Sequence, residues 1–149
     1  SKYNMDNYFN AFYDIVKETQ ETSGYVLPID LESYIVMLLS HHIDKPDWLP
    51  EKSFAETYLS LSDSRRKRLT AKELGDSCLF LTGVFPQYAE SRNKRRYYQD
   101  IGSSSYEVVS ELLPGDLFEQ LSIHFIFLSD FIELTVNTKK DSINDIFVV

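Results

Sequence analysis

Cysteine is almost absent from this chain, whose 149 residues include only Cys78. A single thiol cannot form an intrachain disulfide, which excludes a disulfide-stabilised fold and favours a reducing, cytoplasmic compartment. Long apolar runs are also missing, since the stretch 123–128 is bounded by serines and is far shorter than the roughly 18 residues of a membrane helix. The first 22 residues carry four acidic side chains, which is not typical of a signal peptide. These absences predict a soluble, cytoplasmic domain that does not enter a membrane.

Sequence motifs that carry chemistry are missing as well. The five glycines are isolated and form neither a Gly-x-Gly-x-x-Gly loop nor a Walker loop, and no Glu-x-x-His, His-Glu-x-x-His or paired-cysteine motif occurs. His41 and His42 are adjacent, so on a helix they point about 100° apart and only one of them could bind a given metal ion. The serines at 103–105 lack the strand-to-helix turn that exposes a hydrolase nucleophile. We expect no catalytic residue, metal or cofactor, and a function that is not enzymatic.

Apolar and aromatic residues are abundant, at 43% and 14% of the chain. Apolar side chains recur three and four positions apart, which is the spacing of an amphipathic helix. This spacing predicts a short helix from Ser53 and longer helices over 5–20, 30–42, 64–85, 92–113 and 116–137. The sequence therefore predicts an all-α fold, a bundle of about six helices. We expect one domain over 1–137 and a C-terminal tail, 138–149, that is either docked or mobile.

Several residues in these predicted helices indicate how they pack. Gly75 and Gly83 each cost about 1 kcal/mol relative to alanine inside a helix, so they indicate close helix contacts or a kink. Cys78 falls on the apolar stripe of the same helix and is interpreted as a core residue. Pro86 is expected to end that helix. The predicted helix 116–137 is apolar on more than one face, so we expect it at the centre of the bundle, with an oligomer interface as the alternative.

Charge is distributed unevenly along the chain. Residues 1–64 hold four basic and eleven acidic side chains, residues 65–98 hold nine and three, and residues 99–149 hold two and nine. The three segments therefore carry −7, +6 and −7, which sum to the net charge of −8. An acidic total argues against a general nucleic-acid binder, but the middle segment differs electrically from both ends.

The basic residues form two clusters, each near the predicted N-terminus of a helix, where the helix dipole disfavours cations. The candidate binding surface consists of Arg65, Arg66, Arg68, Arg92, Arg95, Arg96, Tyr97 and Tyr98. One interpretation is a site for an anion, a nucleic acid or an acidic protein, with the tyrosines stacking on a ring. The other is that these cations pair with acidic helices of the same bundle. If the two helices form an antiparallel hairpin, the clusters begin at opposite ends of a rod about 30 Å long.

A family resemblance adds to this interpretation. The block 74–86 (LGDSCLFLTGVFP), followed by Tyr97-Tyr98, Gly102 and Tyr106, resembles a pattern found in a family of uncharacterised bacterial all-helical proteins. The segment 31–39 (LESYIVMLL) is similar to an earlier part of that family. The resemblance implies a bacterial helical domain, and it implies no activity, cofactor or catalytic residue.

Three functional hypotheses follow from these observations. The first is a non-enzymatic bacterial helical module that binds a protein partner, or a second copy of itself, through the basic and tyrosine-bearing surface. The alternative is a regulator that binds a small molecule or an anion, with or without enzymatic activity, in a pocket between helices lined by Tyr34, His42 and Tyr98. Binding of RNA or single-stranded nucleic acid comes third, because the net charge of the chain is negative.

Overall fold

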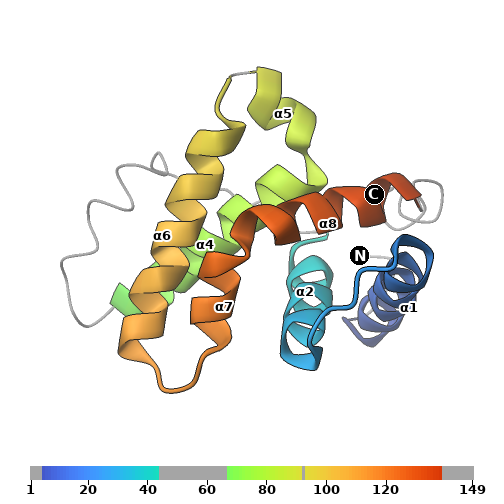
Figure 1. Ribbon diagram of the computed structural model, residues 1–149, viewed down its shortest axis with the longest axis horizontal. Helices are drawn as coiled ribbons and strands as arrows, with labels where there is room; N and C mark the ends of the chain where they lie inside the picture. The colour runs from blue at the N-terminus through green and yellow to red at the C-terminus, as the bar shows by residue number, and fades with distance from the viewer. Residues whose placement is uncertain (1–4, 44–66, 92, 139–149) are drawn as a thin grey trace.

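The computed structural model describes residues 5–43, 67–91 and 93–138 of the chain (Figure 1). These residues form seven helices and no strand: α1 (Met5–Ser23), α2 (Ile29–His42), α4 (Lys67–Val84), α5 (Pro86–Ser91), α6 (Arg95–Leu112), α7 (Leu117–Ile123) and α8 (Phe125–Thr138). The predicted all-α fold is confirmed. None of the helices described is both long and apolar enough to cross a membrane.

The ends of the helices agree with the apolar spacing in most places and differ at two. α1, α2, α4 and α6 lie where the spacing predicts them, with ends shifted by a few residues. α4 ends at Val84, which confirms that this helix stops at Pro86, but Pro86 itself begins the short helix α5, which was not predicted. Proline suits that position because the first turn of a helix does not need the N–H that proline lacks. The helix predicted over 116–137 is divided at His124 into α7 and α8. The helix predicted from Ser53 and the tail after Thr138 lie outside the described residues.

The central helix of the bundle is α4. Every residue from Leu74 to Val84 is buried, and α4 contacts α2, α5, α6 and α8. The prediction that the segment 116–137 is central is therefore wrong. Within that segment α8 lies on one side of α4 and reaches across to α1, leaving Ile126 and Phe127 40% and 38% exposed (Figure 1). The second apolar face of α8 is therefore exposed to solvent, because α4 occupies the centre of the bundle.

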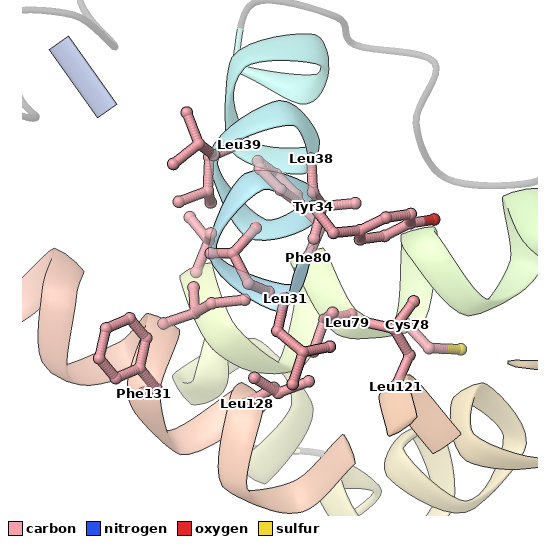
Figure 2. Close-up of a cluster of buried hydrophobic side chains, with 14 of the residues drawn as sticks. Leu31, Tyr34, Leu38, Leu39, Cys78, Leu79, Phe80, Leu121, Leu128 and Phe131 are labelled. Atoms are coloured by element: carbon pink, nitrogen blue, oxygen red, sulfur yellow. The ribbon is translucent and has the colours of Figure 1, made fainter. Parts of the chain in front are cut away.

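The core lies along α4, where neighbouring helices pack their apolar side chains against it. Figure 2 shows side chains of α2, α7 and α8 converging on the buried side chains of α4. The best-packed members are less than 2% exposed: Phe12, Ile35, Leu39, Leu79, Phe80, Leu81, Tyr106, Leu121, Phe125, Leu128, Phe131 and Ile132. Cys78 is also fully buried, which confirms its interpretation as a core residue.

Glycines allow α4 to approach its neighbours closely. A Cβ atom added to Gly75 would lie 2.6 Å from the ring of Tyr106 on α6, and one added to Gly83 would lie 2.6 Å from Ile132 on α8. Both are far shorter than a normal van der Waals contact, so the two glycines sit at helix contacts, as the sequence predicts. Gly75 faces Tyr106 while Cys78, farther along α4, faces the earlier residue Gly102, so α4 and α6 run antiparallel.

The turn between α1 and α2 is held by a buried side-chain amide. Gln20 donates from Nε2 to Glu32 at 2.5 Å and accepts the backbone N–H of Leu27 on Oε1 at 2.7 Å. Gly24 supplies the positive φ of +79° that turns the chain out of α1. The loop 24–28 is therefore fixed against the bundle at both ends, and the ring of Tyr25 packs edge-on against Phe127 of α8, with 5.3 Å between ring centroids.

Candidate functional site

The second basic cluster begins at a tight turn between α5 and α6. Asn93 adopts a left-handed φ of +53°, and the backbone N–H groups of Asn93 and Lys94 donate to Glu90 and Ala89, both at 2.9 Å. This pair of bonds is the Schellman arrangement that closes a helix, and asparagine tolerates the left-handed conformation better than most residues. The turn places Arg95 at the first position of α6, next to α5 and α8.

Arg95 is used inside the bundle rather than on its surface. Its Nη2 atom lies 2.7 Å from Glu133 and 3.2 Å from Asp130, both on α8, and its Nη1 atom lies 3.4 Å from Glu90 on α5. Nη2 also donates to the carbonyl of Thr82 on α4 at 3.4 Å. The side chain of Arg95 is 20% exposed and joins four helices. For Arg95, this agrees with the interpretation that the basic residues pair with acidic helices of the same bundle.

The other members of the predicted basic surface are spread among different environments. Arg96 is exposed and pairs with Asp100 one turn later at 3.0 Å. Tyr97 is 41% exposed, and the ammonium of Lys94 lies 5.8 Å from its ring centroid. Tyr98 is buried in the core and does not contribute to a surface. The side chains of Arg65, Arg66, Arg68 and Arg92 lie outside the described residues.

The residues of the predicted pocket, Tyr34, His42 and Tyr98, make their described contacts with different neighbours. The ring of Tyr34 packs against Tyr106 with 6.2 Å between centroids, and Tyr98 precedes Tyr106 on α6 by about two turns, or about 12 Å. His42 stacks on Phe80 of α4, with 5.3 Å between ring centroids. The sequence pattern placed these side chains on the inner faces of α2 and α6, but it could not show how far apart the helix crossing sets them.

A buried carboxylate on α4 occupies the position where the pocket was expected. Asp76 is 6% exposed, and its Oδ1 atom accepts hydrogen bonds from the hydroxyls of Tyr34 at 2.5 Å and Tyr106 at 2.7 Å. Its Oδ2 atom accepts a bond from the ammonium of Lys72 at 3.0 Å, and that ammonium also lies 5.6 Å from the Tyr34 ring centroid. We call these four residues the Asp76 cluster. It connects α2, α4 and α6 through one charged group.

The electrostatics of the Asp76 cluster keep its hydroxyls protonated. Burial, and then the nearby charge of Asp76, raise the pKa of Tyr34 and the pKa of Tyr106 well above that of an exposed tyrosine. Both carboxylate oxygens accept hydrogen bonds from within the bundle, so Asp76 is held in a buried polar network that joins three helices. Sequence reasoning named Tyr34 but missed Asp76, whose signal was an acidic residue within the apolar stretch 74–86.

The other groups capable of chemistry are also committed to the core. Burial lowers the pKa of His42, whose Nδ1 atom donates to the carbonyl of Leu38 at 2.9 Å, so the imidazole is held neutral. Burial raises the pKa of the Cys78 thiol, which removes its nucleophilic character. Within the part of the chain that the structure describes, no three His, Cys, Asp or Glu residues are grouped to hold a metal ion.

A surface of exposed apolar side chains lies where the 24–28 loop meets α7 and α8. The contact between Tyr25 and Phe127 joins the two segments. Large side chains are exposed on both, and we call them the α8 face: Tyr25 50%, Val26 84%, Ile123 63%, Ile126 40% and Phe127 38%. Ile123 ends α7, and Ile126 and Phe127 lie in the first turn of α8, so these three residues lie at the bend between the two helices. Scattered apolar exposure is ordinary, whereas a cluster of exposed apolar side chains is a candidate interaction surface.

Comparison of the chain with family models, with curated proteins and with solved structures found no match. The site is therefore defined by the geometry of this chain alone.

Proposed function

We propose that this chain is a non-enzymatic helical module of the bacterial cytoplasm that binds a protein partner through the α8 face. The observation that carries the proposal is the contact between Tyr25 and Phe127, which joins exposed apolar side chains from two distant segments into one surface. The free, buried thiol of Cys78 fits a reducing compartment. The family resemblance of the segments 31–39 and 74–86 supports the bacterial origin.

Protein binding agrees with the way the bundle uses its polar residues. Asp76 and Arg95 bond to neighbouring helices and His42 stacks on Phe80 of α4, so these side chains stabilise the fold. The α8 face, in contrast, presents aromatic and branched side chains that lose contact with water only when another molecule covers them. Aromatic anchors of this type supply most of the binding energy in protein interfaces.

The proposal is tested by photo-crosslinking inside the cells that produce the chain. A benzophenone side chain replaces Phe127 in one variant and Tyr97 in a second. Tyr97 is a matched control, because it is exposed to a similar degree and belongs to the basic surface predicted from the sequence. Arg95 and Gln99, two positions to either side of it, both bond to α8, so Tyr97 points away from that helix.

We expect a covalent adduct of defined mass, containing a second protein, from the variant at 127 and not from the variant at 97. Adducts from position 97 alone would move the binding surface to the basic residues Lys94 and Arg96. The absence of any protein adduct from position 127 would contradict the proposal.

A further inference from the structure

The segments that carry the α8 face contain acidic residues but no lysine or arginine. Residues 18–43 and 113–138 together hold eight carboxylates, four in each segment, and none of the chain's 15 basic residues. Their combined charge of −8 equals the net charge of the whole chain, so the remaining residues sum to zero. Within these segments Glu32 pairs with Lys17, and Asp130 and Glu133 pair with Arg95, so the other carboxylates are the ones that could meet a partner.

Several of these carboxylates lie beside the exposed apolar residues. On α7, Glu119 precedes Ile123 by one turn, and Asp116 precedes Glu119 by three positions, so all three share one side. Glu21 and Asp30 lie on either side of the loop that carries Tyr25 and Val26. These carboxylates are exposed, and the ion pairs found among the described residues do not involve Glu21, Asp30, Asp116 or Glu119.

We propose that the α8 face binds a cationic amphipathic helix of a partner protein, with apolar side chains on Ile123 and Phe127 and basic side chains toward the surrounding carboxylates. This inference rests on the proposed function and names the chemistry of the partner. An amphipathic helix offers an apolar stripe that can cover the exposed side chains at the bend between α7 and α8. Charge complementarity selects the cationic form of such a helix.

The same charges disfavour other occupants. In a symmetric dimer built on the α8 face, each surface meets its own copy, which places Glu119 and Asp30 near carboxylates of the same sign. Nucleic acids and anionic lipid surfaces carry negative charge as well, so the face repels them. A cationic helix is the occupant that covers the apolar side chains and neutralises their surroundings.

The inference is tested with two labelled model peptides of about 18 residues, or five helical turns. Each has leucine along one side, and the other side carries lysine in the first peptide and glutamate in the second. Binding to the full chain is measured by fluorescence anisotropy at low and high salt, and self-association by sedimentation velocity. The test variants are Phe127→Ser, Ile123→Ser, and the charge-neutralising pair Asp30→Asn with Glu119→Gln.

Matched controls separate the face from general effects. Tyr97→Ser removes an exposed aromatic side chain elsewhere, and Asp14→Asn with Glu73→Gln removes the same charge from exposed positions on α1 and α4. We expect the lysine peptide to bind the unmodified chain, and to bind the Phe127→Ser variant about tenfold more weakly. We expect about threefold weaker binding to the Asp30 and Glu119 pair, and weaker binding at high salt. The controls should bind like the unmodified chain, and Ile123→Ser repeats the test if Phe127→Ser perturbs the circular-dichroism spectrum.

The outcomes that would overturn the inference also separate it from the proposed function. Equal or tighter binding of the glutamate peptide, lost in Phe127→Ser, would reject the cationic partner and keep the face as a binding surface. A dimer that dissociates in Phe127→Ser would make a second copy the occupant. Failure of both peptides to bind, together with a monomeric chain, would reject the cationic partner, while the crosslinking experiment at position 127 decides the proposed function independently.

Discussion

The ring of Tyr106 lies directly against the backbone of Gly75, at the crossing of α4 and α6. A methyl group on Gly75 would come within 2.6 Å of two atoms of that ring. The ring cannot move aside easily, because it is fully buried and its hydroxyl donates to Asp76 at 2.7 Å. The helix pair therefore depends on the missing side chain at position 75.

Gly75→Ala should destabilise the protein even though alanine is the better helix former. At a contact of 2.6 Å we expect overpacking to cost about 2 to 3 kcal/mol, the upper part of its usual range, which exceeds the gain of about 1 kcal/mol in helix propensity. The free energy of unfolding, measured by urea denaturation, should fall by about 1 to 2 kcal/mol. Ser33→Ala, at an exposed position on α2, should change it by less than about 0.5 kcal/mol. A Gly75→Ala protein as stable as the original would contradict the close packing described here.

Asp76→Asn should be destabilising by about 2 to 3 kcal/mol, because an amide replaces one carboxylate oxygen with a donor. Facing Lys72, the NH₂ group would meet another donor. Facing the tyrosines, it would leave both hydroxyl protons without the acceptor that they have now. The measurement is again urea denaturation, at pH 7. Asp100→Asn, which weakens an exposed pair with Arg96, is the control and should cost less than about 1 kcal/mol. Equal effects of the two substitutions would show that the Asp76 cluster adds little to stability.

Stability should fall at high pH because Tyr34 and Tyr106 stay protonated in the folded protein. The pKa values of Tyr34 and Tyr106 are raised in the folded protein, so unfolding releases their protons once the pH exceeds about 10. Their contribution is complete below the unfolded pKa and is lost as the pH rises above it. Two such groups give a slope of about −2.7 kcal/mol per pH unit in the free energy of unfolding.

This slope is isolated by comparison with the double variant Tyr34→Phe and Tyr106→Phe. Thermal or urea unfolding between pH 9 and 11 should show a steeper decline in the original chain than in the double variant. Tyr97→Phe, which changes an exposed ring, should leave the decline unchanged. Parallel curves for the original chain and the double variant would mean that the tyrosines ionise freely in the folded state.

Arg95→Ala should destabilise the protein by about 1 to 3 kcal/mol, since it leaves Glu133 and Asp130 close together without their cation. Arg95→Lys should recover only part of that loss, because a single ammonium cannot reach α4, α5 and α8 together as the guanidinium does. Arg96→Ala is the adjacent control, with an exposed side chain and an effect below about 1 kcal/mol. Full rescue by lysine would show that charge alone matters at position 95.

Apolar spacing predicted the helices well because burial of one face fixes that spacing locally. The stripes of α1, α2, α4 and α6 appear in the sequence as clearly as in the structure. The bend at His124 was not predicted, since backbone hydrogen bonds such as that from Leu128 to His124 continue across it and the apolar spacing is not interrupted. The sequence also predicted the wrong central helix. Both α4 and α8 are rich in apolar residues, and only their packing decides which of them is surrounded by other helices.

The sequence by itself determined that this chain is helical and that Cys78 belongs to the core, and it limited Gly75 and Gly83 to a close helix contact or a kink. These features depend on the character of a residue and its neighbours within a few turns. Tertiary structure decided the fate of each charged or aromatic side chain: Arg95 turned inward to α8, Tyr98 entered the core, and Tyr25 met Phe127 at the surface. Those outcomes depend on which helices cross and on which residues lie at each crossing. Contacts between residues so far apart in the chain produce no periodic pattern in the sequence.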